Sequence, residues 1–500
     1  MPRHPRRRRL LLAAGAALAV AGGAVGVALA RGDGASTDDR GPAGGADSTV
    51  PATTAPEASP PEPGQSGAPG VGDPYFPGAG NGGYDVDHYV LALTWDPEAR
   101  RLDGVATIEA TAATQGLSRF SLDLVGLEVT DVTVDGAPAA WERDGRELVI
   151  TPDGTVAAGA GFTAVVAYGG SPEAVAGPAP LDPGFIVEDD GEVHVAAEPI
   201  GAATFLPSND HPSDKATFEI RVTVPEGLDV AANGVLRRTQ PGDRPGTETW
   251  VYDVADPMAT YLVQVVVADL RVEELTGPGG LPIRNVYDAD LGTAVGAAIG
   301  RQGDMIGFFE DQFGPYPFAT YGAAVVDQAL GFALETQTLS LFGPDTASEP
   351  VVAHELAHQW FGNHVSPASW QDIWLNEGFA TYAEWLWAEH AGATTVDDAA
   401  AEAAGIPGLD HPPADPGADA LFRGSVYMRG GLTLHVLRRT VGDDAFFDLL
   451  RTWLDRYGGS SASTADFEAL AAEVGGQDVR PLLDAWLRSP RLPRLSDWLR

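Results

Sequence analysis

Cysteine is absent from the sequence, and positive charge is scarce. Without cysteine the chain cannot form disulfide bonds or cysteine-ligated zinc and redox sites. The 31 basic residues face 70 acidic ones, and Lys215 is the only lysine, so the formal net charge is −39. Such a surface repels nucleic acid and anionic lipid, which argues against a polynucleotide partner. The simplest interpretation is an acidic, solvated surface that keeps an exported protein soluble.

The N-terminus has the pattern of an export signal. Arginines at positions 3 and 6–9 precede an uncharged apolar run over residues 10–30, which ends in the small-residue pattern Ala28-Leu29-Ala30. This order predicts a signal peptide over residues 1–30. The apolar run is also long enough to remain uncleaved as a membrane tether. We therefore expect an exported protein, either secreted or anchored at the cell surface, outside the cytoplasm.

Composition divides the rest of the chain into three segments. Residues 31–72 are rich in Gly, Pro, Ser, Thr and Ala, which predicts a disordered linker. Residues 73–275 carry short alternating runs such as 89–93 and 261–267, which predict a β-rich N-terminal domain. After the Gly- and Pro-rich residues 276–280 the period becomes helical, so residues 276–500 are predicted to form a second domain. Its predicted helices cover residues 351–361, 376–390, 430–440, 444–457 and 464–474.

A metal-binding pattern lies in the first of these helices. Residues 354–358 read His-Glu-Leu-Ala-His, which is the HExxH pattern. Residues four apart lie on one helix face, so the imidazoles of His354 and His358 can reach a single metal ion. Glu355 lies one step around the helix, where it can take a proton from metal-bound water. Glu377 on the next helix supplies a third ligand, and the fourth position left open is typical of a catalytic zinc site.

At these residues the chain resembles the aminopeptidase N family of zinc metallopeptidases, which also contains leukotriene-type hydrolases. The matching stretches are residues 354–363 and 374–380, and the resemblance extends over about residues 73–500. It implies an all-β sandwich or saddle followed by a thermolysin-like α+β catalytic domain, with the site between them and one Zn²⁺ per chain. It also implies a short, bacterial-type member without the family's C-terminal helical domain. The more open cleft of such a member would admit longer or partly folded substrates.

Residues 331–336 resemble the family's GxMEN exopeptidase signature, an edge strand along which the peptide lies. The resemblance implies that its glutamate, here Glu335, binds the free α-ammonium group of the substrate. A carboxylate held at a fixed distance from the metal would bring the peptide bond after the first residue to the metal, so that one residue is removed. The segment departs from the signature at two positions, with Phe332 where Gly is usual and Thr336 where Asn is usual.

Other site residues also follow from the resemblance. Glu198 is similar to a second amine-binding residue that the β domain supplies to the site. Tyr427 is similar to the tyrosine that hydrogen-bonds the tetrahedral intermediate, and a neutral phenol is a suitable donor to an oxyanion. Asp372 is a candidate for orienting a zinc-bound histidine.

The predicted function is the zinc-dependent removal of the first residue from peptides that have a free N-terminus, with Glu355 as general base and Tyr427 stabilising the oxyanion. Two alternatives remain open. A zinc endopeptidase would result if Phe332 or the open cleft disabled amine binding, and N-terminally blocked peptides distinguish it. A cell-surface adhesion or scaffold protein would keep the fold but catalyse no reaction. A protein that only binds a partner does not need the spacing of these site residues, which argues against this alternative.

Overall fold

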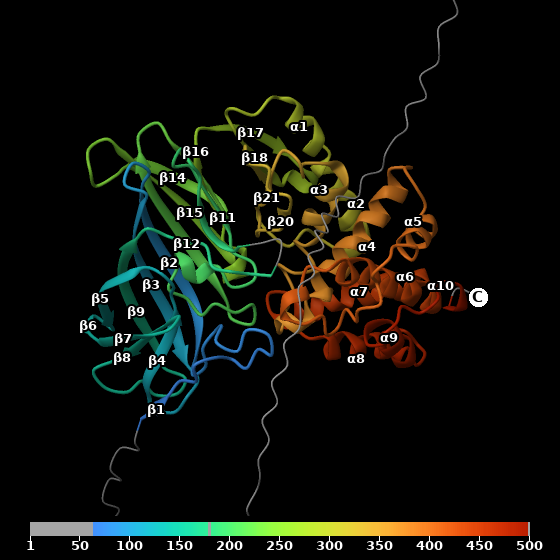
Figure 1. The fold of residues 1–500 in the computed structure, drawn as a ribbon, viewed down its shortest axis with the longest axis horizontal. Coiled ribbons are helices and arrows are strands. Elements are labelled where there is room, and N and C mark those ends of the chain that lie inside the picture. Colours follow the sequence, from blue (N-terminus) through green and yellow to red (C-terminus); the bar gives the residue numbers. More distant parts are fainter. Residues whose placement is uncertain (1–63, 179–181, 499–500) are drawn as a thin grey trace, which may run out of the picture. The chain divides into compact units, whose positions relative to one another are not determined.

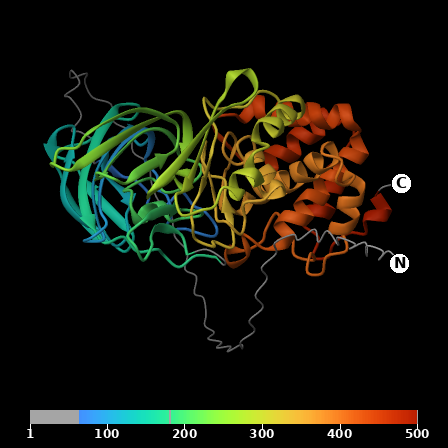
Figure 2. The same cartoon turned by 90° about the horizontal axis from the view of Figure 1, so that it is seen from above.

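The computed structural model describes residues 64–178 and 182–498, and residues 64–500 form one compact unit. The predicted signal peptide or tether and most of the predicted linker lie outside the described residues. Ordered structure begins before the predicted start at Asp73, because β1 (Gln65–Ser66) pairs in parallel with β4 (Leu117–Asp123). Within residues 64–500, Figures 1 and 2 show the strands of the N-terminal half on one side and the helices on the other.

The N-terminal half is built from three sheets, and the largest has eight strands. Alternate residues of its strands face the core, as in β2, where Leu91, Leu93 and Trp95 are buried. Its strands are, in spatial order, β14 (Val235–Pro241), β15 (Thr247–Ala259), β12 (Lys215–Pro225), β2 (Tyr84–Asp96), β3 (Arg101–Ala112), β9 (Gly161–Gly170), β5 (Glu128–Val134) and β6 (Ala137–Pro138). All neighbours are antiparallel except β12 and β2, which are parallel.

Two four-stranded sheets complete this half. The first consists of β1, β4, β8 (Glu147–Thr151) and β7 (Ala140–Asp144). The second consists of β10 (Gly184–Val187), β11 (Val193–Ala196), β16 (Val265–Ala268) and β13 (Asp229–Ala232). The predicted strand over residues 261–267 is shorter than expected, since Thr260–Leu262 forms a 3₁₀ turn closed by a hydrogen bond from Val263 N to Thr260 O. Strand β11 ends two residues before Glu198.

A five-stranded mixed sheet begins the second half of the unit. Its order is β17 (Leu270–Thr276), β18 (Pro282–Asp288), β19 (Ala323–Val325), β21 (Ser340–Phe342) and β20 (Ala333–Leu334). The Gly- and Pro-rich segment at 277–280, from which the sequence predicted a domain boundary, is the turn of the β17–β18 hairpin. Strand β20 is an edge strand, and Glu335 follows it directly.

The remainder of the unit consists mostly of helices, together with a two-stranded parallel sheet of β22 (Ser366–Pro367) and β23 (Ser461–Ala462). The helices are α1 (Ala294–Ile299), α2 (Gln302–Phe313), α3 (Glu349–Ala357), α4 (Trp374–His390), α5 (Val396–Ala403), α6 (Gly430–Val441), α7 (Asp443–Tyr457), α8 (Thr464–Val474), α9 (Arg480–Leu487) and α10 (Leu495–Trp498). The all-β half followed by this α+β half confirms the predicted fold class. Helix α3 is shorter than the predicted 351–361, because the chain tightens into three-residue turns, with Gln359 N bonded to Leu356 O and Trp360 N to Ala357 O.

A close approach of two glycines fixes the helices around the site. A Cβ atom on Gly378 would lie 2.8 Å from Cα of Gly430, so the backbones of α4 and α6 touch at this point. Only residues without a side chain permit such an approach. Gly378 follows Glu377, and Gly430 follows the single π-helical turn Ser425–Arg429 that carries Tyr427. The contact therefore holds Tyr427 close to the third predicted metal ligand.

Candidate active site

Helices α3 and α4 bring the three predicted metal ligands to one point. Nε2 of His354 lies 3.1 Å from Oε2 of Glu377, and Nε2 of His358 lies 3.6 Å from the same oxygen. One donor atom from each of the three residues lies within 4.8 Å of the others, and all three side chains are buried. This arrangement follows from the four-residue spacing on α3 together with the packing of α3 against α4.

The far nitrogen of each imidazole has its own partner. Nδ1 of His354 lies 2.6 Å from Oε1 of Glu384, and Nδ1 of His358 lies 3.1 Å from the carbonyl oxygen of Phe361. When both Nδ1 atoms donate, both Nε2 lone pairs point toward Glu377 and can bind a metal. Sequence reasoning missed Glu384. Its seven-residue distance from Glu377 on one helix was an available signal, since two turns return to the same face.

The electrostatics of this group fit a divalent cation. Burial alone would raise the pKa of the Glu377 carboxyl, but hydrogen bonds with His354 and His358 lower it to about 2. Although burial opposes it, the pKa of His354 is well above its usual value because the carboxylates of Glu377 and Glu384 flank the ring. A site that attracts positive charge this strongly, with two imidazoles and one carboxylate as donors, has the ligand set of a catalytic zinc centre.

Glu355 is buried next to these ligands. Carboxylate oxygens of Glu355 and Glu335 and a ring nitrogen of His358 lie within 4.8 Å of one another. Burial raises the pKa of Glu355 to about 8, with the imidazoles opposing the rise and the neighbouring carboxylates adding to it. A carboxyl group tuned close to neutral pH can both accept and deliver a proton.

Glu198 and Glu335 bring two further carboxylates to the site from different halves of the unit. Each side chain is only 2% exposed. Within the described part of the chain, Oε1 of Glu198 and Oε1 of Glu335 have no hydrogen-bond partner. Burial raises the pKa of both groups, and for Glu198 the repulsion from Glu335 adds to the rise. Buried acceptors without a partner are costly, so this pair is suited to a cationic ligand.

Tyr427 lies against the metal-binding group. Its ring stacks on His354 at a centroid distance of 5.9 Å and an interplanar angle of 20°. Burial raises the pKa of Tyr427 well above its usual value, and the carboxylates of Glu377 and Glu198 add to the rise. The phenol therefore stays protonated and can donate a hydrogen bond. The structure thus gathers the predicted site residues into one group, with the exception of Asp372.

Comparison with known proteins identifies the family. The Peptidase M1 N-terminal domain model matches residues 85–262, and the Peptidase family M1 domain model matches residues 298–486. A solved M1 zinc metallopeptidase variant from Deinococcus radiodurans, bound to a Tyr-ser-ala substrate, is 35% identical. The alignment has a TM-score of 0.80 and covers 85% of this chain and 99% of that one. The chain belongs to peptidase family M1. It is accordingly a zinc metallopeptidase, and Zn²⁺ is its cofactor.

Curated M1 relatives are more distant and longer. Aminopeptidase M1-C of Oryza sativa subsp. japonica is 27% identical in an alignment 415 positions long, which covers 77% of this chain and 46% of that protein. Glutamyl aminopeptidase of Homo sapiens is 26% identical in an alignment 330 positions long, which covers 60% of this chain and 34% of that protein. The chain thus spans about half the length, or less, of the curated relatives it matches.

Asp372 does not orient a metal ligand in this M1 structure. Its Oδ1 accepts hydrogen bonds from the backbone nitrogen and the hydroxyl of Thr464, at 2.9 and 2.7 Å. Asp372 therefore holds the start of α8, and the expectation that it contacts a zinc-bound histidine is wrong. Glu384 occupies that place instead, because it lies on α4 with Glu377, whereas Asp372 precedes the helix.

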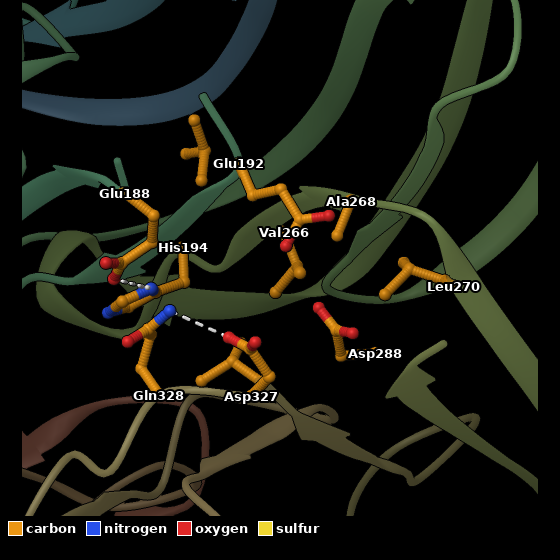
Figure 3. Close-up of a pocket in the computed structure, with 11 residues that line it drawn as sticks. Glu188, Glu192, His194, Val266, Ala268, Leu270, Asp288, Asp327 and Gln328 are labelled. Carbon is orange, nitrogen blue, oxygen red and sulfur yellow. Dashed lines mark hydrogen bonds and ion pairs between the residues drawn. The ribbon is translucent and has the colours of Figure 1, made fainter. Parts of the chain in front are cut away.

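A second group of carboxylates lies outside this M1 site and was not anticipated from the sequence. Oxygens of Glu192, Asp288 and Asp327 lie within 4.8 Å of one another beside His194, at the ends of β11, β18 and β19 (Figure 3). Burial raises the pKa of Glu192 to about 8, and a hydrogen bond with Asp288 adds to the rise. Glu192 is therefore more easily protonated near neutral pH than an ordinary glutamate, because burial and the neighbouring carboxyl both disfavour its charged form.

Proposed function

We propose that the protein is a zinc aminopeptidase that removes the first residue from peptides with a free α-amine. The observation that carries this proposal is the pair of buried, unpartnered carboxylate oxygens on Glu198 and Glu335, next to the zinc-ligand group. A pair of buried carboxylates suits the ammonium group that every unblocked peptide carries at its N-terminus. An endopeptidase has no use for two such groups at this place.

The two carboxylates would select the substrate through charge-assisted hydrogen bonds. An ammonium group offers three donors, and bonds to ionised acceptors are roughly twice as strong as neutral ones. Because Glu198 and Glu335 come from different halves of the unit, they can approach the amine from two sides. A blocked N-terminus would leave both acceptors unpaired, which penalises binding.

The hydrolytic step uses groups whose positions are described above. His354, His358 and Glu377 would hold Zn²⁺, which supplies Lewis-acid chemistry that acidifies water and polarises a carbonyl group. Glu355 accepts the proton of the attacking water and delivers it to the leaving amine nitrogen. Tyr427 donates its phenolic hydrogen to the carbonyl oxygen as negative charge develops there.

The relatives agree with this proposal. The curated relatives reported above are named aminopeptidases, and the Deinococcus radiodurans structure was solved with a tripeptide whose N-terminal residue is tyrosine.

Paired peptides with free and acetylated N-termini test the proposal. An aminopeptidase releases the first amino acid from the free peptide and leaves the acetylated peptide intact. Internal cleavage of both peptides at similar rates would instead establish the endopeptidase alternative. Absence of any zinc-dependent hydrolysis would establish a non-catalytic binding protein.

We also propose that the protein is exported, on the basis of the arginine-rich and apolar residues 1–30. Among residues 64–178 and 182–498, no helix combines the length and apolarity needed to cross a bilayer. Cell fractionation combined with N-terminal sequencing of the mature protein tests export. A protein that keeps its first residues and stays in the cytoplasm would contradict it.

A further inference from the structure

The turn that carries Glu335 is held from two sides. It connects β20 to β21 and includes Thr338, whose φ of +66° is unusual for a β-branched residue. On the side of the N-terminal half, Asn233 Nδ2 donates to Gln337 O at 2.6 Å, and Gly234 N donates to Thr338 Oγ1 at 2.7 Å. A backbone conformation of this kind persists only where the surroundings determine it.

On the other side the turn is bound by two amides that follow the zinc ligand His358. Gln359 Nε2 donates to the carbonyl oxygen of Glu335 at 3.0 Å, and Gln359 Oε1 accepts from Thr338 N at 2.9 Å. One side chain thus holds both ends of the turn. Asn363 Nδ2 donates to the same Glu335 carbonyl at 2.7 Å. Both amides are fully buried.

We propose that Gln359 and Asn363 are positioning residues that set the distance between the amine-binding carboxylate of Glu335 and the zinc ligands. This inference rests on the proposed function. The two amides are the direct connection between the α3 end of the metal site and the turn of Glu335. They bind the backbone of Glu335 and leave its carboxylate for the substrate.

The covalent geometry of a peptide explains why this distance matters. In an α-amino acid the amine nitrogen and the carbonyl carbon are about 2.5 Å apart, because only one carbon separates them. The carboxylate must therefore be held within about 0.5 Å of its place for amine binding and carbonyl attack to occur together. An N-terminal β-amino acid adds a bond of about 1.5 Å between the two groups. The preference of the enzyme for an α-amino acid over a β-amino acid at the N-terminus therefore shows how precisely the distance between the Glu335 carboxylate and the zinc ligands is fixed.

Gln359→Glu is the sharpest variant. It keeps the size of the side chain and the acceptor for Thr338 N, but it replaces the donor to the Glu335 carbonyl with an oxygen. A matched control is Gln302→Glu on α2, which also introduces a buried carboxylate. Gln302 Oε1 accepts from Asn285 Nδ2 at 2.9 Å, and Gln302 Nε2 has no partner among the described residues, so this substitution keeps the existing contact.

The measurement compares two otherwise identical peptides that begin with alanine or β-alanine. The wild-type protein should strongly prefer alanine. Gln359→Glu should reduce that preference, measured as the ratio of the two kcat/KM values, by about tenfold, mostly through a higher KM for the alanine peptide. Zinc content should stay at the wild-type level. In an inactive Glu355→Gln background, calorimetry should show weaker binding of L-alanine amide when Gln359→Glu is added. Gln302→Glu should leave the ratio and this binding unchanged.

A purely structural role of Gln359 predicts a different result in the comparison of the two peptides. If Gln359→Glu lowered both kcat/KM values by one factor and kept their ratio, the positioning role would be overturned. If Gln359→Glu fails to fold, Asn363→Asp replaces it, because this change also puts a carboxylate oxygen in place of the donor to the Glu335 carbonyl, and Asn363 Oδ1 has no partner within the described residues that would be lost. The same ratio of kcat/KM values is then measured. A wild-type protein that cleaves free and acetylated peptides equally would refute the proposed function itself, which is a separate outcome.

Discussion

Glu384 lies 2.6 Å from Nδ1 of His354, on the side of the ring away from Glu377. This contact fixes the tautomer of His354, so that Nε2 presents a lone pair to the metal. It also connects α4 to α3 a second time, two helical turns after Glu377. Glu384 would therefore act on a metal held by His354 through the histidine rather than by direct contact.

Glu384→Gln should weaken zinc binding by about 10- to 100-fold, which is typical for the loss of such a partner. Competition with a chelator of known affinity measures this change. Exposed Glu402 on α5 offers a control, because Glu402→Gln removes the same charge at a distance from the histidines. Equal zinc affinity in both variants would show that Glu384 contributes only general negative charge.

Glu355→Gln should retain zinc and lose almost all turnover. The amide fits the same buried place on α3 but cannot accept a proton, and general-base catalysis is worth about 10²–10⁴-fold in rate. Metal analysis and single-turnover kinetics on one preparation separate the two effects. A parallel loss of zinc and activity would instead mark Glu355 as part of the metal site.

The pair of predicted metal-binding histidines could be recognised in the sequence because their arrangement depends only on the spacing of residues within one short segment. The spacing of His354 and His358 places both rings on one face of any helix. Tyr427, the two glutamates proposed to bind the amine and the fold class followed from a family resemblance. Spacing places Glu384 on the helix face of Glu377, but it does not give the partner of Glu384 or of Asp372, since each partner lies on another element. The same holds for Gln359, whose partners lie across the interface between α3 and the β20–β21 turn.

Local geometry also explains the errors in element length. The apolar pattern of residues 351–361 is continuous, but the chain leaves the α-helix after Ala357. The tighter turns that follow put the amide of Gln359 and later that of Asn363 next to Glu335. A periodicity argument detects which residues are buried, not the partner that each backbone amide finds.

Glu335→Ala should lower kcat/KM for free peptides by about 10- to 100-fold, because a hydrogen bond to a charged group is lost. Most of the change should appear in KM, with zinc content unaltered. Inhibition by acetylated peptides serves as the internal control, since these peptides carry no ammonium group for Glu335 to bind. An equal loss of affinity for free and acetylated peptides would contradict the amine-binding role.

Tyr427→Phe separates catalysis from packing. The ring and its stacking on His354 remain, and only one hydroxyl group is lost. If that hydroxyl meets the developing oxyanion, kcat should fall by about 10²–10³-fold while KM and zinc content stay almost constant. A packing role predicts a lower unfolding temperature with kcat nearly intact. Measuring kcat and the unfolding temperature of the same sample decides between the two.

Glu192 provides a test of how the second carboxylate group depends on pH. Burial and the hydrogen bond with Asp288 raise the pKa of Glu192 to about 8 in the folded protein, against 4.5 for an unperturbed glutamate. The folded state therefore binds a proton more tightly than the unfolded state. Its contribution to stability is complete below the unfolded pKa and is lost as pH rises through the folded pKa.

Glu192→Gln should remove this pH dependence. The backbone nitrogen of Asp269 donates to Oε1 of Glu192 at 3.3 Å, and the glutamine oxygen can keep that bond while its NH₂ group donates to Asp288. The amide thus replaces the protonated carboxyl of Glu192 with a donor that does not titrate. Between about pH 5 and about pH 8, the wild-type unfolding temperature should fall relative to that of Glu192→Gln, and the difference should level off above about pH 8. Glu402→Gln should run parallel to the wild type over the same range. A constant difference between wild type and Glu192→Gln would mean that the pKa of Glu192 is not raised in the folded protein.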